Sequence, residues 1–337
     1  MFSEYEPKKF MKQRKLTYSQ AIRESLHQSL DADPKVFAIG QGLWSPWYVG
    51  NSMEDLDKVF GRARIIDSPV SENGITGIAI GAALGGMKPV VIHPRMDFML
   101  LAIDQIVNEA ANWHYIFGGE AHVPLVIRSI INRGGEQGAQ HSQALYSWFM
   151  HIPGLKVVVP STPYDAKGLM LASIADNNPV IYVDDRWLYD HSGIVPQEPY
   201  EVPLGKANID AKGSDVTLVG ISYMAHEARE AAKVLYQDSI SVEVVDLRSL
   251  SPLDTTTILQ SVKKTGRLVI ADGAWATCGA SSEIAAVVAQ QGFRYLKSPI
   301  ERITLPECPA PTSKSLEDAY YPDKNDIISA IRTLLLP

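Results

Sequence analysis

Short apolar runs recur along the first half of this chain, and stretches with helical spacing separate them. Each run is continuously apolar, whereas a strand with one face in water would alternate apolar and polar residues. Continuous runs are typical of strands that are covered on both faces of a parallel sheet. The order of runs and helices therefore predicts a doubly wound, mostly parallel α/β domain. The expected strands span residues 36–40, 90–93, 125–127, 157–159 and 180–183, and helices are expected at 100–115 and 164–175.

The same alternation begins again after a proline-containing stretch that lacks helical periodicity. Three prolines fall between residues 196 and 203, which is typical of a connection between domains. We expect a first domain at residues 1–190, a linker at 191–212 and a smaller second α/β domain at 213–337. The elements expected in the second domain are strands at 216–220, 242–246, 268–271 and 300–303, and a helix at 227–236. A chain of 337 residues is long enough to build two hydrophobic cores.

The composition argues against several classes of protein. The formal net charge is -7, so the chain has no basic footprint for nucleic acid. No apolar run reaches the ~18 residues that a membrane helix needs. Residues 1–15 are polar and lysine-rich without an apolar core, so they do not read as a secretory signal, and a cytoplasmic location is expected. The two cysteines, Cys278 and Cys308, are too few for a disulfide framework, and we expect Cys278 to be a small packing residue.

A lone carboxylate stands inside the most distinctive segment of the chain, residues 65–83. A short apolar run ends at Asp67, a polar turn follows, and a helix-like segment of small and aliphatic residues comes next. Glu72 lies at the start of that segment, where free N–H groups and the helix dipole favour an anion. From spacing alone two roles stay open for Glu72. One is a helix-capping acid, which is the commoner case, and the other is an acid with a catalytic function.

Residues 65–83 also resemble a known family, the beta subunits of the thiamine-diphosphate-dependent 2-oxo acid dehydrogenase E1 component. This family includes the pyruvate, branched-chain 2-oxo acid and acetoin dehydrogenases, and its domains are transketolase-like. The resemblance covers nearly the whole chain, with the motifs in the family's order and at its spacing. The further matching segments are residues 95–98, 102–108, 138–143, 153–161, 165–169 and 316–320.

The resemblance implies that thiamine diphosphate is the cofactor and that this chain contacts its pyrimidine ring. Activation of the cofactor needs a carboxyl group hydrogen-bonded to N1′ of that ring, and Glu72 matches the residue with this role. Phe98 matches an aromatic residue that packs against the ring, although spacing alone would make it an ordinary core residue. Gln41 follows the glycine of the first strand, where the family usually has an acidic pair. Gln41 is therefore expected as a further contact to the pyrimidine side, but a neutral one.

His141 is the second residue to which the resemblance gives a catalytic role. It lies in a loop rich in Gly and Gln and matches the family's Gln-His-Ser motif, whose histidine faces the substrate and the incoming lipoyl group. An imidazole there can stabilise developing charge or transfer a proton. Without the resemblance, a solvated loop histidine would explain the same residue. The other histidines, including His93, His114, His122 and His226, are expected to be structural.

A separate partner chain is expected because one half of the usual cofactor site is missing. The motif that anchors the diphosphate through Mg²⁺ begins with Gly-Asp-Gly, which does not occur in this sequence. The resemblance therefore implies that an alpha subunit holds Mg²⁺ and the diphosphate in an α2β2 heterotetramer with a beta–beta contact. A lipoyl acyltransferase core is a further partner that the resemblance implies.

A structural potassium ion is also implied by the resemblance. Many beta subunits of the family hold this ion through backbone carbonyls, and an ordinary helix C-terminus would explain the same residues without an ion. The corresponding positions are Leu125, Ser173, Ile174, Asp176 and Asn178.

The expected activity is the oxidative decarboxylation of a small 2-oxo acid, with transfer of the acyl group to a lipoyl group. Two alternatives stay open: a two-chain transketolase-type enzyme that moves a ketol or acyl unit without lipoate, and a non-catalytic partner subunit. Arg95 and Arg133 lie in segments that depart from the family's pattern. A guanidinium binds a carboxylate or phosphate bidentately, so an extra anionic group on the substrate would explain them. Asp185 and Glu136 are the internal carboxylates that could pair with these arginines instead.

Overall fold

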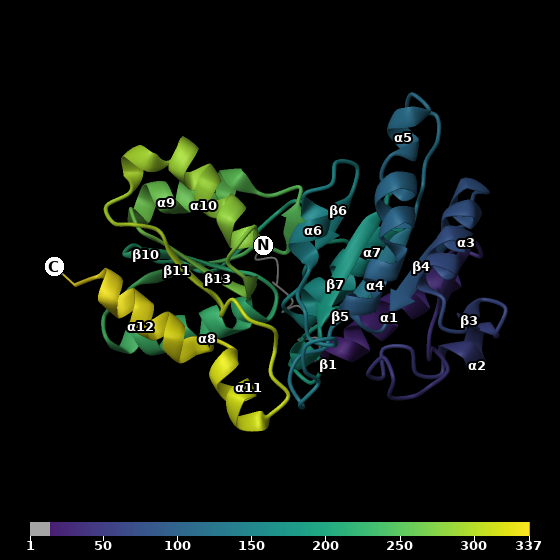
Figure 1. Cartoon of the computed structure of the whole chain (residues 1–337), viewed down its shortest axis with the longest axis horizontal. Helices are drawn as coiled ribbons and strands as arrows, with labels where there is room; N and C mark the ends of the chain where they lie inside the picture. Colours follow the sequence, from purple (N-terminus) through teal and green to yellow (C-terminus); the bar gives the residue numbers. More distant parts are fainter. Residues whose placement is uncertain (1–13, 337) are drawn as a thin grey trace, which may run out of the picture.

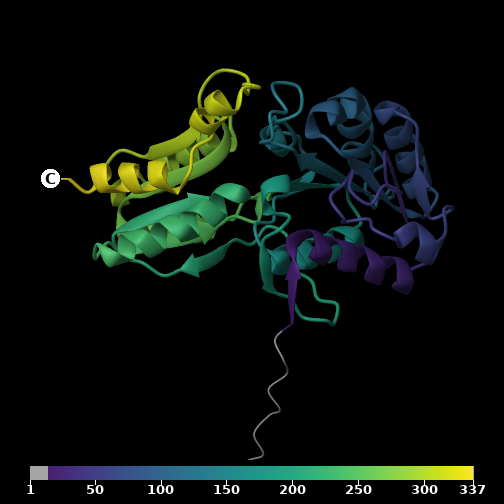
Figure 2. The ribbon, with the colours of Figure 1, turned by 90° about the horizontal axis from the view of Figure 1, so that it is seen from below.

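The computed structural model describes residues 14–336, which form two α/β lobes side by side (Figure 1). The larger lobe, the first domain, is built on a seven-stranded sheet, and the smaller lobe, the second domain, on a five-stranded sheet. Figure 2 shows the lobes from below, with the C-terminus at the outer end of the smaller one. Residues 1–13, most of the segment judged not to be a secretory signal, lie outside the described residues. Within residues 14–336 no helix is both long and apolar enough to cross a membrane.

The first sheet has the strand order β12-β6-β7-β5-β4-β2-β3, and all its neighbouring strands are parallel except β12 and β6. Apolar residues of α1 and α7 cover one face, while α3 and the segment after α4 cover the other. The predicted doubly wound, mostly parallel sheet is confirmed. The elements up to residue 194, of which β1 and β8 form a separate two-stranded sheet, are β1 Lys15–Thr17, α1 Tyr18–Ala32, β2 Val36–Gly40, α2 Leu56–Phe60, β3 Ile65–Asp67, α3 Glu72–Leu84, β4 Lys88–His93, α4 Met96–Met99, α5 Trp113–Ile116, β5 Val126–Ile131, α6 Tyr146–Met150, β6 Lys156–Val158, α7 Pro163–Ala175, β7 Val180–Asp185 and β8 Ser192–Ile194.

The second sheet has the order β14-β13-β10-β11-β9, with only β9 antiparallel to its neighbour. Helices α8 and α12 cover one face, and α9 and α10 pack on the other as part of a core cluster shared with the first domain. The elements from residue 208 onward, of which β12 joins the first sheet, are β9 Asn208–Ala211, β10 Val216–Gly220, α8 Tyr223–Gln237, β11 Val242–Asp246, β12 Ser249–Ser251, α9 Thr255–Thr265, β13 Leu268–Trp275, α10 Ala280–Gln291, β14 Glu301–Leu305, α11 Lys314–Tyr320 and α12 Lys324–Leu334.

Two features differ from the sequence-based expectation. The helix expected at 100–115 is not regular, because a 3-10 turn at Leu100–Ala102 and a π-helical turn at Gln105–Ala110 interrupt it. Asn112 closes this stretch by donating its side-chain amide to the Val107 carbonyl at 3.0 Å. The segment expected to link the domains contains β8, which pairs with β1, and β9, which edges the second sheet. The domain boundary at 191–212 stays a prediction. Strand β12 comes after this boundary in the sequence but pairs with β6 of the first sheet.

A buried group of charged residues connects the two domains. Ser161, after β6, donates a hydrogen bond to Asp246 at the end of β11, and Arg229 of α8 donates to Ser161 Oγ at 2.9 Å. Arg248 forms an ion pair of 2.8 Å with Asp165 of α7. Burial and the neighbouring carboxylates of Asp165 and Asp210 together raise the pKa of the Asp246 carboxyl to about 7, although Arg229 opposes them.

This raised pKa predicts a pH-dependent stability. A carboxyl with a higher pKa in the folded than in the unfolded protein stabilises the fold when protonated, and this contribution is lost as pH rises. The free energy of unfolding should therefore fall between the ordinary value of 3.8 and about pH 7. Urea unfolding at pH 5.5 and 7.5 measures the effect. In Asp246→Asn the difference between the two pH values should shrink by about 1 kcal/mol or more.

The matched control for this prediction is Asp31→Asn, at an exposed position of α1. This variant should keep the wild-type difference in stability between the two pH values. An Asp246→Asn protein with an unchanged pH dependence would show that Asp246 does not hold an extra proton in the fold.

Candidate active site

The carboxyl ends of four neighbouring strands bring the sequence-predicted site residues to one edge of the first sheet. Strands β3, β2, β4 and β5 are adjacent and parallel. The residues that follow these strands are Glu72 after β3, Gln41 after β2, Phe98 after β4 and His141 after β5. Ligands of open α/β sheets bind outside the carboxyl ends of the strands. The four residues therefore share the edge at which a ligand is expected.

Glu72 and Gln41 form a buried pair at this edge. Gln41 Nε2 donates a hydrogen bond of 3.0 Å to Glu72 Oε1, and both side chains are buried. The position of Gln41 depends on the close approach of β2 and β4, because a Cβ at Gly40 would lie 2.3 Å from the Ile92 carbonyl oxygen. Among residues 14–336, only Gln41 hydrogen-bonds the Glu72 carboxylate, and no backbone N–H does. Glu72 therefore begins α3 without capping it.

The surroundings of Glu72 carry no positive charge in hydrogen-bonding contact. Thr76, one turn further along α3, donates its hydroxyl to the Glu72 carbonyl at 2.8 Å and lies 3.3 Å from His93 Nε2. Burial lowers the pKa of His93 to about 4, so its imidazole is neutral near pH 7. The Glu72 carboxyl therefore sits among neutral polar groups, and a ring nitrogen could hydrogen-bond to it without competing with a salt bridge.

Phe98 and His141 form a second contact at the same edge. Their rings meet edge to face, with centroids 5.3 Å apart and planes at 89°. The Phe98 side chain is 37% exposed, which leaves part of the ring open to a ligand. Asp97 anchors the loop of His141, because its Oδ1 accepts hydrogen bonds from the backbone and side-chain nitrogens of Gln143 at 3.2 and 2.8 Å. Burial raises the pKa of Asp97, and the neighbouring His141 opposes this effect.

Comparison with known proteins identifies the family of the chain. The pyrimidine binding domain of transketolase matches residues 14–190, and the transketolase C-terminal domain matches residues 205–327. The acetoin:2,6-dichlorophenolindophenol oxidoreductase beta subunit of Cupriavidus necator is 44% identical over 95% of this chain and 97% of its own. The corresponding subunit of Bacillus subtilis is 42% identical over 96% and 98%. The pyruvate dehydrogenase E1 beta subunit of Rickettsia felis is 40% identical over 94% and 97%.

The chain belongs to the family of transketolase-like dehydrogenase beta subunits. This family is thiamine-diphosphate-dependent, as the sequence motifs predicted. A solved split-gene transketolase, described as an inactive beta4 tetramer, has the same fold, with a TM-score of 0.76 over 95% of this chain and 98% of that chain. Its sequence identity of 21% supports the likeness of fold alone.

The described residues of this beta subunit fit the pyrimidine half of the family's cofactor. An aminopyrimidine ring requires a carboxyl group at N1′ and an apolar surface for its face, and Glu72 and Phe98 offer these two groups. One Glu72 oxygen accepts from Gln41, and the other makes no hydrogen bond with a residue of the described chain. The individual roles of Glu72, Phe98, His141 and Gln41 stay predictions.

Within residues 14–336 the side chains do not fit the diphosphate half. The Asp272-Gly273 pair resembles the second half of the missing Gly-Asp-Gly motif. Asp272 is fully buried and accepts hydrogen bonds from Tyr146 Oη and from the backbone nitrogens of Ala274 and Ser281. It therefore connects the two domains and is not available to a metal ion. No group of three or more His, Cys, Asp or Glu residues suited to a metal occurs within residues 14–336.

Arg133 lies close to the candidate site, and the sequence did not decide which group faces its charge. Its guanidinium lies 2.9 Å from Asp185, and both side chains are buried. It also lies over the rings of Trp187 and Tyr321, 5.5 and 5.8 Å from their centroids. Asp185, named above as one candidate partner, is therefore the carboxylate that faces Arg133. The ion pair connects the end of β5, where the His141 loop begins, to the end of β7.

The second domain holds the same loop at further points. Glu317 of α11 accepts a hydrogen bond from the Glu136 backbone nitrogen at 3.2 Å. A Cβ at Gly138, which has a φ of +72°, would lie 2.7 Å from Thr312 Oγ1. Glu317 belongs to the matching segment 316–320, so the motif was visible in the sequence but its contact was not. The loop of His141 is thus fixed between the two domains.

The five residues of the predicted potassium site lie together at the opposite edge of the first sheet. Ser173 and Ile174 are in the last turn of α7, and Val180 of β7 donates its N–H to the Leu125 carbonyl at 2.9 Å. The Asp176 carboxylate accepts hydrogen bonds from Lys156 and from the Asn178 nitrogen atoms. An ion there would have to be held by backbone carbonyl oxygens, which accept two hydrogen bonds or ligands each. Potassium binding stays a prediction.

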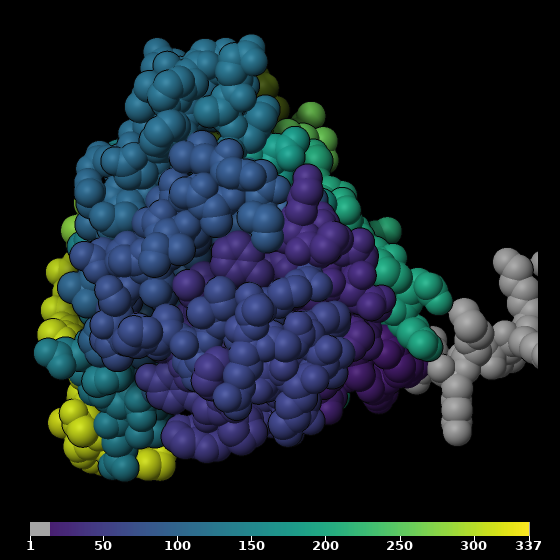
Figure 3. All heavy atoms as spheres, turned by 90° about the vertical axis from the view of Figure 1, so that its right-hand side faces the viewer, coloured from purple at the N-terminus to yellow at the C-terminus, as the bar shows by residue number. Residues whose placement is uncertain are grey.

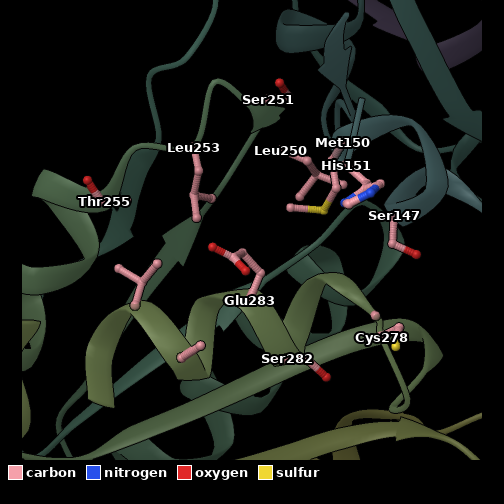
Figure 4. Close-up of a pocket in the computed structure, with 13 residues that line it drawn as sticks. Ser147, Met150, His151, Leu250, Ser251, Leu253, Thr255, Cys278, Ser282 and Glu283 are labelled. Carbon is pink, nitrogen blue, oxygen red and sulfur yellow. The ribbon is translucent and has the colours of Figure 1, made fainter. Parts of the chain in front are cut away.

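A cavity of ≈ 690 Å³ lies between the two domains (Figure 4), and none of the predicted site residues lines it. It is lined by α6, by α10 and by the segment between β12 and α9. Cys278 lies at its rim and is exposed, so the expectation of a packing role for this cysteine is wrong. Cys278 occupies the turn between β13 and α10 with a φ of +55°, and this turn leaves its side chain outside the core.

The Arg133–Asp185 pair predicts a specific pattern of stability. Arg133→Met leaves the buried Asp185 without its counter-charge, and breaking a buried pair costs about 3–5 kcal/mol. The double variant Arg133→Met/Asp185→Asn removes the charge that was left and should recover at least half of the loss. Urea unfolding measures the free energies, and limited proteolysis should show faster cleavage in residues 134–140 of the single variant. Additive losses in the double variant would mean that the two side chains are not coupled.

Proposed function

We propose that this chain is the beta subunit of a thiamine-diphosphate-dependent dehydrogenase that decarboxylates a small 2-oxo acid and passes the acyl group to a lipoyl group. The observation that carries the proposal is the buried Glu72 carboxyl, which faces neutral polar groups at the carboxyl edge of the sheet and does not cap its helix. Membership of a family with pyruvate and acetoin dehydrogenase beta subunits supports it.

Each site residue has a definite task under this proposal. When bound, the cofactor supplies a nucleophilic carbon that adds to the carbonyl group of the substrate. Glu72 holds and exchanges the proton at N1′ of the aminopyrimidine ring, and Gln41 keeps the Glu72 carboxyl in place. Phe98 supports the ring face, and His141, in contact with Phe98, hydrogen-bonds or protonates the reacting oxygen. Asp97 and Arg133 position the loop that carries His141.

A separate alpha subunit completes the site under this proposal. It supplies the Mg²⁺ and diphosphate contacts that are missing from the described residues, in an α2β2 heterotetramer that also has a beta–beta contact. Large apolar side chains on α3 and on the segment from α4 to α5 support such contacts, since Ile78, Leu101, Tyr115 and Ile116 are each more than 60% exposed. Figure 3 looks onto this side of the molecule, whose surface the N-terminal part of the first domain forms.

Cleavage of acetoin is a second candidate function. It is favoured by the two relatives at 42–44% identity, which are beta subunits of acetoin oxidoreductases. Acetoin has no carboxyl group, so this reaction releases acetaldehyde and no carbon dioxide. Measuring both products from the assembled enzyme separates the two candidates. Turnover of ketose phosphates without lipoate would instead support the transketolase-type alternative.

Glu72→Gln tests the catalytic proposal. An amide cannot exchange a proton with N1′, so turnover by the assembled complex should fall more than tenfold, which corresponds to at least ~1.4 kcal/mol in the barrier. The cofactor should still bind, as shown by the circular dichroism of its aminopyrimidine ring. Glu301→Gln, at an exposed position of β14, is the matched control and should leave both measurements unchanged. Activity above a tenth of the wild-type rate would exclude the assigned role of Glu72.

The missing diphosphate motif gives a second test. The beta subunit alone should give no heat of binding with thiamine diphosphate in isothermal titration calorimetry, with or without Mg²⁺. Addition of the cognate alpha subunit should create the site and give one bound cofactor for each alpha–beta pair. Tight binding by the isolated chain would contradict the half-site arrangement.

A further inference from the structure

Two arginines at the carboxyl edge of the first sheet lie close together without a carboxylate to neutralise them. Arg95 follows β4 and Arg186 follows β7, two strands that flank β5 in the sheet. Within residues 14–336 neither guanidinium lies within 4.0 Å of a carboxylate, whereas Arg128 and Arg133 at the same end of the sheet each face an aspartate. The charges of Arg95 and Arg186 are therefore not part of the ion pairs that hold the fold.

The two guanidinium groups share one neighbour, Tyr48. The guanidinium carbon of Arg95 lies 5.9 Å from the centre of the Tyr48 ring. Arg186 donates hydrogen bonds of 3.2 Å to the carbonyl oxygens of Tyr48 and Trp47. The loop that carries Tyr48 is packed tightly, because a Cβ at Gly42 would lie 2.1 Å from the Tyr48 ring. The loop thus keeps both arginines in one place.

The hydrogen bonds of Arg95 leave part of its guanidinium unsatisfied. Nη1 donates to the neighbouring Pro94 carbonyl at 2.9 Å, while Nε is buried and makes no hydrogen bond within the described chain. Asp97 is the nearest acid on the same segment. Its Oδ1 accepts from Gln143, its Oδ2 makes no hydrogen bond within the described chain, and it forms no ion pair with Arg95. Burial and then the like charge of Arg186 lower the pKa of Arg95, and smaller opposing effects of Tyr48, Tyr189 and Asp97 do not cancel them. A buried donor and a repelled charge are costly unless an anion faces them.

We propose that Arg95 and Arg186 form a subsite for an anionic group, a carboxylate or a phosphate, of the substrate. The assignment rests on the proposed function, and it narrows the substrate to a 2-oxo acid with a second anionic group. A fork of N–H donors on each guanidinium matches the oxygen atoms of either group bidentately.

The placement of the pair connects this subsite with the proposed catalytic residues. Arg95 lies three residues before Phe98, at the start of the same helical segment, and the loop of Tyr48 begins directly after Gln41, the partner of Glu72. An anionic group held by the two arginines therefore lies at the edge of the sheet where the proposed cofactor ring lies. Arg133 is excluded from this role, because Asp185 already faces it.

Substrate selectivity of the assembled alpha–beta enzyme tests the subsite. The substrates are 2-oxobutyrate, with an uncharged side chain, 2-oxoglutarate, with a second carboxylate, and 3-phosphonooxypyruvate, with a phosphate. The wild-type enzyme should have a higher kcat/KM for one of the two anionic compounds than for 2-oxobutyrate. The preferred compound shows whether the subsite binds a carboxylate or a phosphate. In Arg95→Met and in Arg186→Met, the ratio of kcat/KM for that compound to kcat/KM for 2-oxobutyrate should fall ~10- to 100-fold.

Two further variants control for charge and shape. Arg95→Lys keeps a charge without the bidentate fork and should lose less of the ratio than Arg95→Met does. Arg294→Met, at an exposed position of the second domain, removes one positive charge elsewhere and should leave the ratio unchanged. An equal loss of kcat/KM for charged and uncharged substrates would overturn the proposal. Dissociation of the alpha subunit from the variants on gel filtration would also overturn it, because the arginines would then be part of the subunit interface.

Direct binding gives a readout that does not depend on turnover. Trp47 is 69% exposed beside Arg186, so its fluorescence should report malonate, a non-reactive dicarboxylate, on the complex without cofactor. Arg95→Met should weaken malonate binding at least tenfold, and acetate should compete poorly. If no substrate turns over but malonate binds in this manner, the proposed function fails and the anion subsite stands. If substrates turn over but malonate binding is the same in wild type and variant, the subsite fails alone.

Discussion

The buried ion pair between Arg128 and Asp184 is the contact on which the carboxyl edge of the first sheet depends. It joins β5 to β7 through two hydrogen bonds, and neither side chain is exposed. The same guanidinium donates to Ser52 in the loop after β2 and to Tyr189 in the segment after β7. A buried charge left without its partner would cost about 3–5 kcal/mol, so these four elements are held in one arrangement. The Gln41 and Tyr48 loop, and the segment of Arg186, take their positions from this network.

The candidate site has one part that is fixed within the first domain, and the described residues lack the part that would bind a diphosphate. The fixed part is the strand edge with the Glu72–Gln41 pair and the Phe98–His141 contact, which packing or hydrogen bonds within the first domain hold in place. The second domain adds Glu317, which fixes the loop of His141, and Asp272, which accepts one hydrogen bond from Tyr146 of the first domain and two from backbone nitrogens of its own domain. Because the described residues hold no group of acidic, histidine or cysteine side chains suited to a metal ion, the proposed function assigns the diphosphate half of the site to a second chain.

The sequence predicted the fold well where local pattern decides structure, and less well where contacts between distant residues decide it. The apolar runs at 36–40 and 180–183 became β2 and β7 because a strand buried on both faces needs no polar residue. The irregular helix after Met99 could not be read from spacing, since all its residues tolerate a helical conformation. Cys278 was misjudged because its exposure depends on a left-handed turn between β13 and α10. Of the candidate site, the motifs gave the residues, but the absence of a cap at Glu72 required coordinates.

The arginines show most clearly what residue type alone cannot decide. Arg95 and Arg133 looked equivalent in the sequence, because both are charged residues in segments expected near the substrate. In the structure, Arg133 has a buried aspartate and two aromatic rings around it, so its charge is used to hold the fold. Arg95 has a tyrosine ring, a backbone carbonyl and a second arginine around it, and its charge forms no ion pair in the described chain. The difference lies in Asp185, which reaches Arg133 because β5 and β7 are paired in register at Ile131 and Asp185. Strand register thus decides which charge stabilises the protein and which is left to select a ligand.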